Sequence, residues 1–374
     1  MKIKYRPEID GLRTIAVLSV IIYHMNIYVG SALFFKGGFF GVDIFFVISG
    51  FLITSLIIAE LEETERFSIF NFYERRIRRI FPILFLVIFV SIPFAFKYLL
   101  PAQMIDFSKS LLASLFFGSN FYWHYAFQQY GAESAALRPF VHTWSLSVEE
   151  QFYVFFPLIM IMIHRWAKPY RLIILSIFTL LSLSLAQWTT MSNPSLSFHM
   201  LPSRFWELTT GAIVAHILYV NPEIRPSRLY KWLPHFGLFL ILYSIVFIPF
   251  KFGQHPGYIT LIPVLGTVFV IGFSRQNDFT TKLLSRKLFV GIGLISYSLY
   301  LWHHPIFAFG HILNHNPGFY DKTIWILLTF ILSILSYFLI ECPFRSRNRV
   351  SRKTLLLSVA AAIIAISAFS VYTI

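Results

Sequence analysis

An arginine and a histidine, Arg13 and His24, are separated by ten residues that are nearly all apolar. Eleven helical steps cover roughly 16 Å, about half of the hydrocarbon thickness of a bilayer. Placing ionisable side chains in hydrocarbon costs free energy, so such residues within a membrane segment indicate a functional site. We therefore expect Arg13 near one face of a membrane and His24 well towards the other.

A carboxylate, Asp43, is expected at the same depth in the membrane as His24. The first apolar segment ends near residue 29 and the second begins near residue 37, so His24 and Asp43 lie about equally far below the same surface. The short connection makes the two predicted helices neighbours. An aspartate that accepts a hydrogen bond from one imidazole nitrogen makes the other nitrogen more basic. The pair could remove a proton from an alcohol, or it could be a buried pair with a structural role alone.

A basic run, Arg75-Arg76-Ile77-Arg78-Arg79, precedes the third apolar segment. Guanidinium groups match phosphate oxygens bidentately, so this run and Arg13 could hold a polyphosphate. Topology determination or the binding of anionic lipid is the alternative interpretation. The chain contains no Walker loop, dinucleotide glycine fingerprint, HExxH or GxSxG, which excludes the nucleotide-binding folds typical of soluble proteins.

Other polar residues interrupt the apolar pattern near the face where His24 is expected. Two adjacent glutamates, Glu149 and Glu150, lie within one apolar segment, where unpaired carboxylates are costly. Arg204 and Glu207 stand three residues apart and could simply pair along one helix. Another segment ends in the run SYSLYLWHHP at 296–305.

The composition identifies the bilayer as the solvent of this chain. Hydrophobic residues make up 57% and charged residues 13% of the sequence, and the mean hydropathy is +0.68. The net charge of +14 is explained by basic cytoplasmic loops, so we predict no nucleic-acid partner. A single cysteine, Cys342, excludes an intrachain disulfide and a cysteine-based metal cage. His311 and His315 have the spacing of metal ligands but no carboxylates nearby, so we predict no metal site.

Apolar segments recur along the chain, and the basic residues orient them. With a cytoplasmic N-terminus, 23 of the 31 Lys and Arg residues fall in predicted inner segments. If residues 107–124 spanned the membrane, every later loop would change sides and the basic loops would lie outside. We therefore expect 107–140 to be an outer interfacial or re-entrant helix with a loop. The predicted fold class is an all-α, polytopic transmembrane bundle. Its eleven spans lie at about 9–29, 37–60, 80–99, 142–163, 172–190, 205–220, 232–250, 259–273, 288–308, 323–342 and 354–374.

With these features the chain resembles acyltransferase family 3, especially bacterial O-acetyltransferases of surface polysaccharides. The spacing of Arg13 and His24 is the family's signature element. The resemblance implies a ten-helix acyltransferase core at 1–345, followed at 346–374 by a basic linker and an eleventh helix. In the longest members an outer SGNH-type domain follows such a helix, so this is either a short member or a chain without that domain. The matching stretches are YRPEIDGLRTIAVLSVIIYH at 5–24, GVDIFFVISGFLIT at 41–54, RRIRRIFP at 75–82, HTWSLSVEEQFY at 142–153, RFWELTTGA at 204–212, SYSLYLWHHP at 296–305 and ECPFR at 341–345.

The resemblance implies an integral O-acyltransferase, in particular an O-acetyltransferase, of the bacterial inner membrane. Its donor would be cytoplasmic acyl-CoA such as acetyl-CoA, a substrate rather than a bound cofactor. Its acceptor would be a hydroxyl of an extracytoplasmic carbohydrate such as lipopolysaccharide or O-antigen. A transporter or flippase of a lipid-linked or acylated sugar is the alternative, and it would leave the thioester intact. The implied roles are catalysis by His24 with Asp43, donor binding by Arg13, Arg75 and Arg78, and acceptor binding by Glu149, Arg204, Tyr300 and His303.

Overall fold

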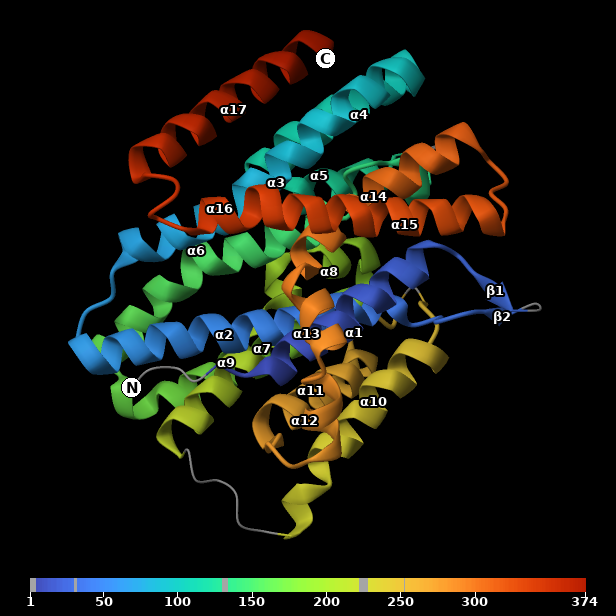
Figure 1. Cartoon of the computed structure of the whole chain (residues 1–374). Helices are drawn as coiled ribbons and strands as arrows, with labels where there is room; N and C mark the ends of the chain where they lie inside the picture. Colours follow the sequence, from blue (N-terminus) through green and yellow to red (C-terminus); the bar gives the residue numbers. More distant parts are fainter. Residues whose placement is uncertain (1–4, 30–31, 130–133, 222–227, 252) are drawn as a thin grey trace. The chain divides into compact units, whose positions relative to one another are not determined.

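The computed structural model describes residues 5–29, 32–129, 134–221, 228–251 and 253–374. Helices dominate these residues (Figure 1), and the strands β1 (Tyr28–Val29) and β2 (Ala32–Leu33) form one short antiparallel pair. The predicted all-α class is therefore confirmed.

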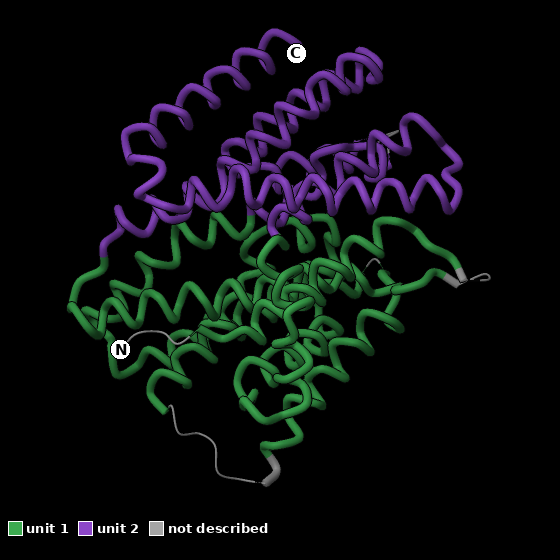
Figure 2. The backbone as a smooth tube through the Cα atoms, in the orientation of Figure 1, with its two compact units in different colours: residues 1–67, 148–296 green, residues 68–147, 297–374 purple. Residues whose placement is uncertain are grey.

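The chain forms two compact units, each built from two separate stretches of sequence (Figure 2). Unit 1 comprises residues 1–67 and 148–296, and unit 2 comprises residues 68–147 and 297–374. Two helices, α6 (Thr143–Trp166) and α14 (Ser296–Leu313), cross the boundaries between these stretches. The boundary predicted between a core at 1–345 and a linker with an extra helix at 346–374 remains a prediction.

Unit 1 contains α1 (Pro7–His24), η1 (Gly38–Phe40), α2 (Gly41–Thr64), η3 (Lys168–Tyr170), α7 (Arg171–Ser192), α8 (Pro194–His199), α9 (Leu201–Val220), η4 (Arg228–Lys231), α10 (Leu233–Phe247), η5 (Tyr258–Thr260), α11 (Leu261–Phe273), α12 (Phe279–Leu284) and α13 (Lys287–Leu294). Unit 2 contains α3 (Ile69–Tyr98), α4 (Pro101–Leu115), α5 (Ser119–Ala126), η2 (Ala135–Leu137), α15 (Phe319–Ser336), the π-helical turn η6 (Tyr337–Glu341), α16 (Cys342–Arg345) and α17 (Arg352–Thr373).

Most of each predicted apolar segment falls on helical residues, although 9–29 ends on β1, and a multi-pass membrane bundle is confirmed. Among the described residues, six helical stretches are long and apolar enough to cross a membrane. Their bounds are Gly38–Thr64, Ile69–Tyr98, Thr143–Trp166, Lys168–Ser192, Phe319–Arg345 and Arg352–Thr373, and two shorter apolar helices lie at Leu233–Phe247 and Tyr258–Phe273. The count of eleven spans remains a prediction.

The segment predicted at 288–308 is not one helix. It is broken at Ile295, which separates α13 from α14. Apolar residues continue across the break, so a hydropathy pattern does not register it.

The segment at 107–124 is also divided. The 15-residue α4 and the 8-residue α5 are separated by a turn in which Phe117 has a φ of 51°. Neither helix reaches the roughly 20 residues that a span requires. The predicted span at 232–250 also contains a helix of only 15 residues, α10, so the position of 107–124 relative to the membrane remains a prediction. Within unit 2, α4 packs along α17, and the hydroxyls of Ser108 and Thr373 lie 2.6 Å apart.

Glycines allow α2 and α9 to pack closely in unit 1. A Cβ added at Gly50 would lie 1.8 Å from the carbonyl oxygen of Leu208, and one added at Gly211 would lie 2.1 Å from that of Val47. Small residues at such contacts let helix backbones approach in membranes, where lipid is as apolar as the side chains. Asp43 and Arg204, which form an ion pair, lie in the first turns of α2 and α9, and the glycine contacts lie further along both helices, so the two helices run parallel. The predicted topology requires this of the second and sixth spans.

We expect Gly211→Ala to destabilise the protein, because the added methyl group forces the α2 and α9 backbones apart. Overpacking of this kind typically costs about 1–3 kcal/mol. Gly291→Ala is the matched control, since nothing lies within 4 Å of a Cβ at that helical position. Thermal unfolding of the detergent-solubilised variants should show a lower midpoint for Gly211→Ala alone. Equal midpoints would contradict the close packing.

Candidate functional site

Arg13 and His24 lie near the two ends of α1. The helix begins at Pro7, whose fixed φ suits the first helical turn, and ends at His24. Eleven steps of about 100° leave the two side chains only about 20° apart around the helix axis, so they share one face. Arg13 Nη1 lies 3.2 Å from Asp10 Oδ1, and the His24 side chain is half-buried. The helix thus presents a guanidinium and an imidazole on the same face.

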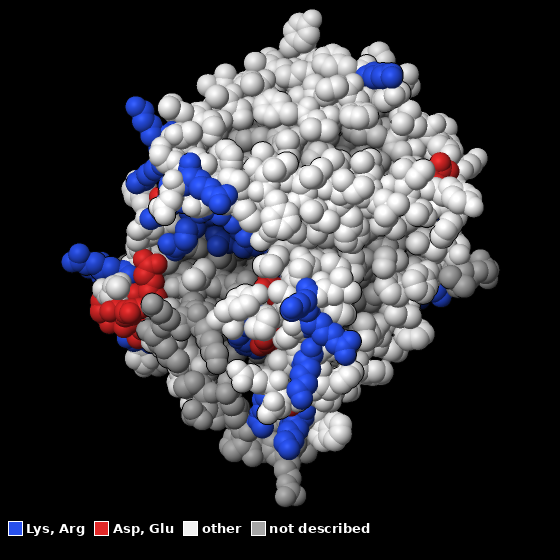
Figure 3. Space-filling model, in the orientation of Figure 1, with Lys and Arg blue, Asp and Glu red and all other residues white. Residues whose placement is uncertain are grey.

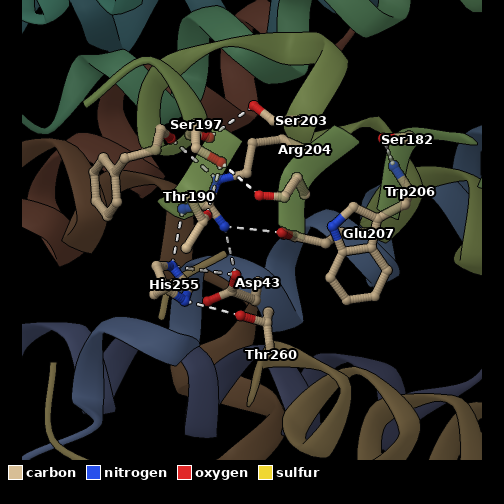
Figure 4. Close-up of polar contacts among 12 residues, drawn as sticks. Asp43, Ser182, Thr190, Ser197, Ser203, Arg204, Trp206, Glu207, His255 and Thr260 are labelled. Atoms are coloured by element: carbon tan, nitrogen blue, oxygen red, sulfur yellow. Dashed lines mark hydrogen bonds and ion pairs between the residues drawn. The ribbon is translucent and has the colours of Figure 1, made fainter. Parts of the chain in front are cut away.

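The end of α1 approaches the beginning of α2, as the short connection predicted. The rings of Tyr23 and Phe39 meet edge to face with centroids 5.6 Å apart. The carboxylate of Asp43 nevertheless turns elsewhere. Its Oδ1 accepts a hydrogen bond of 2.7 Å from Arg204 Nη1 on α9 (Figure 4). The direct His24–Asp43 contact inferred from matching depths is not among the contacts of Asp43, and the catalytic roles of both residues remain predictions.

Arg204 is the centre of this buried cluster, with 1% of its surface exposed. The same Nη1 also donates to Glu207 Oε1 at 2.8 Å, which confirms the predicted pairing along one helix. Nε donates to the carbonyl oxygen of Phe198, and Nη2 lies 2.9 Å from His255 Nε2. One guanidinium therefore joins α2, α8, α9 and the loop that precedes η5.

His255 completes the cluster from the loop between α10 and η5. A guanidinium can only donate, so His255 Nε2 must accept the hydrogen bond from Arg204. The proton of the neutral ring is then on Nδ1, which lies 2.9 Å from Thr260 Oγ1. Burial and the positive charge of Arg204 hold the pKa of His255 well below its ordinary value. No periodicity in the sequence singles out this loop residue.

Charge in the cluster is not balanced by Arg204 alone. Both Asp43 and Glu207 are fully buried, and Asp43 Oδ2 and Glu207 Oε2 receive no hydrogen bond from the described residues. Two carboxylates against one guanidinium leave one excess negative charge, which is costly without water. A proton on one of the two carboxyl groups would balance the cluster. The burial of its ion pairs fits a cluster that holds helices together better than a surface that binds a sugar.

Glu149 is more accessible than Asp43 and Glu207, the two carboxylates of the buried cluster. It lies on α6, is half-buried, and accepts hydrogen bonds from the hydroxyls of Ser49 on α2 and Tyr153 one turn later. Hydroxyl donors leave a carboxylate with further lone pairs for other donors. This arrangement suits the predicted contact with an acceptor hydroxyl.

Tyr300 and His303 belong to unit 2, on α14. Tyr300 Oη donates to the carbonyl oxygen of His142 at 2.9 Å and lies 2.5 Å from Ser145 Oγ. His303 Nδ1 lies 2.6 Å from the carbonyl oxygen of Tyr300, which can only accept. The proton of a neutral ring is therefore on Nδ1, and Nε2 carries the lone pair.

The rings of His142, His303 and His304 form a buried histidine group in unit 2. Their centroids are 5.3–5.7 Å apart. In the part of the chain that the structure describes, no three His, Cys, Asp or Glu side chains are arranged to hold a metal ion. The chemistry open to the group is hydrogen bonding and proton transfer.

The arginine run on α3 divides into an exposed and a buried member. Arg75 is exposed. Arg78 is 2% exposed, and its guanidinium donates to Glu74 Oε1 at 2.9 Å, to the carbonyl of Phe344 at 3.0 Å and to that of Val350 at 2.8 Å. Arg75 remains a candidate for donor phosphates, whereas Arg78 mainly holds the chain after α16.

Comparison with known proteins identifies relatives over nearly the whole chain. Residues 6–342 match the family model of acyltransferase family 3, described as "Acyltransferase domain". The chain is similar to O-acetyltransferase OatA of Staphylococcus aureus (strain NCTC 8325 / PS 47), with 35% identity over 92% of this chain and 58% of the relative. It is also similar to peptidoglycan O-acetyltransferase OatA of Listeria monocytogenes, with 30% identity over 93% of this chain and 57% of the relative. The chain thus spans less than two thirds of these relatives. No solved structure matches it.

We expect Arg204→Met to destabilise unit 1 strongly, because it leaves two buried carboxylates without their cation. Breaking a buried ion pair in this way typically costs about 3–5 kcal/mol. Asp43→Asn and Glu207→Gln, added to Arg204→Met, should recover much of the lost stability. The thermal unfolding midpoint of each variant measures this, with the exposed Arg286→Met as control. A midpoint for Arg204→Met equal to that of the parent protein would show that Arg204 does not stabilise unit 1.

Proposed function

The chain belongs to acyltransferase family 3, and from this membership we propose that it is an integral membrane O-acetyltransferase. The group would pass from cytoplasmic acetyl-CoA to a hydroxyl of an extracytoplasmic cell-surface carbohydrate. The observation that carries the proposal is α1, which holds Arg13 and His24 on one face about 16 Å apart along its axis. A donor with its phosphates at Arg13 could present its thioester towards His24.

In this proposal His24 is the general base. It removes the proton of the acceptor hydroxyl, whose oxygen attacks the thioester carbonyl carbon. The carbon–sulfur bond breaks, and the leaving thiolate takes the proton from the imidazolium. The products are the acetyl ester and free coenzyme A. In a two-step variant the imidazole itself attacks first, and the hydroxyl then takes the acetyl group from an acyl-histidine.

The remaining side chains receive distinct roles. Arg13 and Arg75 would bind donor phosphates, and Arg78 would hold the neighbouring backbone in place. Glu149 would orient the acceptor hydroxyl, with Tyr300 and His303 as further hydrogen-bonding groups. Asp43 and Arg204 would act through the buried cluster, by fixing α2 against α9.

Contacts within each unit agree with the predicted grouping of loops on one side of the membrane. They join segments that the topology prediction assigns to one side of the membrane. In unit 1, His164 Nε2 lies 2.8 Å from Glu65 Oε2, and both residues lie in predicted inner segments. In unit 2, Arg78 donates to the carbonyl of Val350, again between predicted inner segments.

The acceptor is proposed at the level of its chemical class. The name of the Listeria monocytogenes relative points to peptidoglycan, whereas the family resemblance implies a carbohydrate such as lipopolysaccharide or O-antigen. Both offer carbohydrate hydroxyls outside the cytoplasmic membrane. Incubation of the membrane-embedded protein with acetyl-CoA and each glycan, followed by mass detection of ester-linked acetate, would separate the two.

We expect His24→Ala to abolish transfer while the protein still inserts, because the change makes the first helix less polar. Loss of a general base typically lowers the rate about 10²–10⁴-fold. His216→Ala is the matched control, a half-buried histidine of α9 outside the proposed chemistry. Release of coenzyme A thiol and ester formation on the glycan provide the two readouts.

Substantial turnover by His24→Ala would refute the role of His24. Glycan movement across the membrane without consumption of acetyl-CoA by the parent protein would favour the transporter alternative instead.

Single-cysteine labelling tests the sidedness that the mechanism requires. In a Cys342→Ser background, cysteines at Ser134 and Asn316 should react with a membrane-impermeant thiol reagent from outside. Cysteines at Asn277 and Ser351 should react only after the membrane is opened. All four positions are exposed. Reversed labelling at 134 and 277 would mean that 107–124 crosses the membrane, which would place the proposed catalytic residues on opposite sides.

A further inference from the structure

The segment between α16 and α17 is fixed to α3 by its backbone. Arg78 donates to the carbonyl oxygens of Phe344, in the last turn of α16, and of Val350, near the end of this segment. Arg347 Nη2 adds hydrogen bonds of 2.9 Å to Glu74 Oε2 and Asn71 Oδ1. The segment is thus held against the first turns of α3 in a defined conformation.

The acidic residues near this segment are paired inside the protein. Residues 69–79 and 341–353 contain nine Lys and Arg but only two acidic residues, Glu74 and Glu341. Glu74 pairs with Arg78 and Arg347, and Glu341 accepts from Ser298 and Arg345. Both acids are buried, with exposed fractions of 8% and 0%. Their negative charges are therefore paired inside the protein, and the exposed surface of the region is strongly positive.

Several cations of this surface have no acidic partner. Arg349, Arg352 and Lys353 are exposed, and none of the three side chains forms a hydrogen bond or ion pair with the described residues. Figure 3 shows Lys and Arg side chains gathered over the part of the surface where α3 begins and α16 leads into α17. Arg352 also lies over the ring of Phe70, 5.3 Å from its centroid, and that ring is 75% exposed.

We propose that this surface, formed by Arg75, Arg349, Arg352 and Lys353, binds the phosphate groups of the acyl-CoA donor. The inference rests on the proposed function, and it extends to the segment after α16 a role proposed above for Arg13 and the arginine run on α3. Arg78 is then a positioning residue, because its buried guanidinium holds the segment and is not available to a ligand.

The chemistry of the surface fits a polyphosphate. Guanidinium forks bind phosphate oxygens bidentately, and three or more of them can satisfy a diphosphate and a separate phosphate together. An exposed aromatic ring beside an arginine is a stacking platform for a base. Phosphate headgroups of anionic lipid offer the same charge without a base. The test therefore separates these two sources of phosphate.

The experiment compares two double variants of the full-length protein in detergent. Arg349→Gln with Arg352→Gln removes two cations of the proposed surface, and Arg286→Gln with Lys287→Gln removes two exposed cations of another predicted inner loop. Calorimetry with free coenzyme A measures binding without turnover. Sedimentation with phosphatidylglycerol or phosphatidylcholine vesicles measures lipid association. Cysteine labelling at position 134 verifies that the topology is unchanged.

We expect the first pair to raise the Kd for coenzyme A about tenfold or more, with lipid association and the control pair unchanged. Arg349→Lys with Arg352→Lys should give a smaller loss, because lysine lacks the planar fork. Unchanged coenzyme A binding with weaker association to phosphatidylglycerol would overturn the proposal in favour of a lipid surface. No change in either assay would also overturn it.

The outcome is distinguishable from a failure of the proposed function. A parent protein that neither binds coenzyme A nor consumes acetyl-CoA would refute the function itself. A parent protein that consumes acetyl-CoA, with a variant that binds coenzyme A equally well, would refute only the role of this surface.

Discussion

The hydrogen bonds of Arg204 determine how unit 1 is assembled. A guanidinium with 1% exposure in an apolar bundle must keep its partners, since leaving a buried carboxylate unpaired costs several kcal/mol. One face of α2 carries Asp43, Val47 and Gly50 at the spacing i, i+4, i+7. One face of α9 carries Arg204, Leu208 and Gly211 at the same spacing. The glycines bring these faces together, and the ion pair sets their register. A one-turn slip would separate Asp43 from Arg204.

The same principle organises the first turns of α3 in unit 2. Glu74 is neutralised by Arg78 from its own helix and by Arg347 from the later segment. Arg78 Nη1 donates to two backbone carbonyls, so this buried guanidinium holds the later segment in place. Pairing an acid internally has a consequence at the surface, because the neighbouring cations then face water or a ligand without competition. Structural and binding arginines can therefore alternate within one short run.

Much of the fold was predictable because hydropathy and the distribution of basic residues act over long segments. The break at Ile295 was not, since both sides of it are apolar. The Arg204–Glu207 pair follows from helical spacing, whereas the contact between Asp43 and Arg204 joins residues 161 positions apart and has no local signal. Matching depths correctly made neighbours of the first two helices. Depth does not fix the direction of a side chain around its helix, so it does not predict that Asp43 pairs with Arg204.

The ten-residue spacing between Arg13 and His24 has a physical rationale that hydropathy alone does not reveal. Three turns of an α-helix take 10.8 residues, so a separation of eleven returns a side chain almost to its starting direction. A separation of nine or thirteen helical steps would place the imidazole on the other side of α1, far from a ligand held by the guanidinium. One extended molecule could touch both groups only by lying along that face of the helix. The constraint therefore favours a long, flexible substrate with an anionic end and a reactive end, which is the shape of an acyl-CoA.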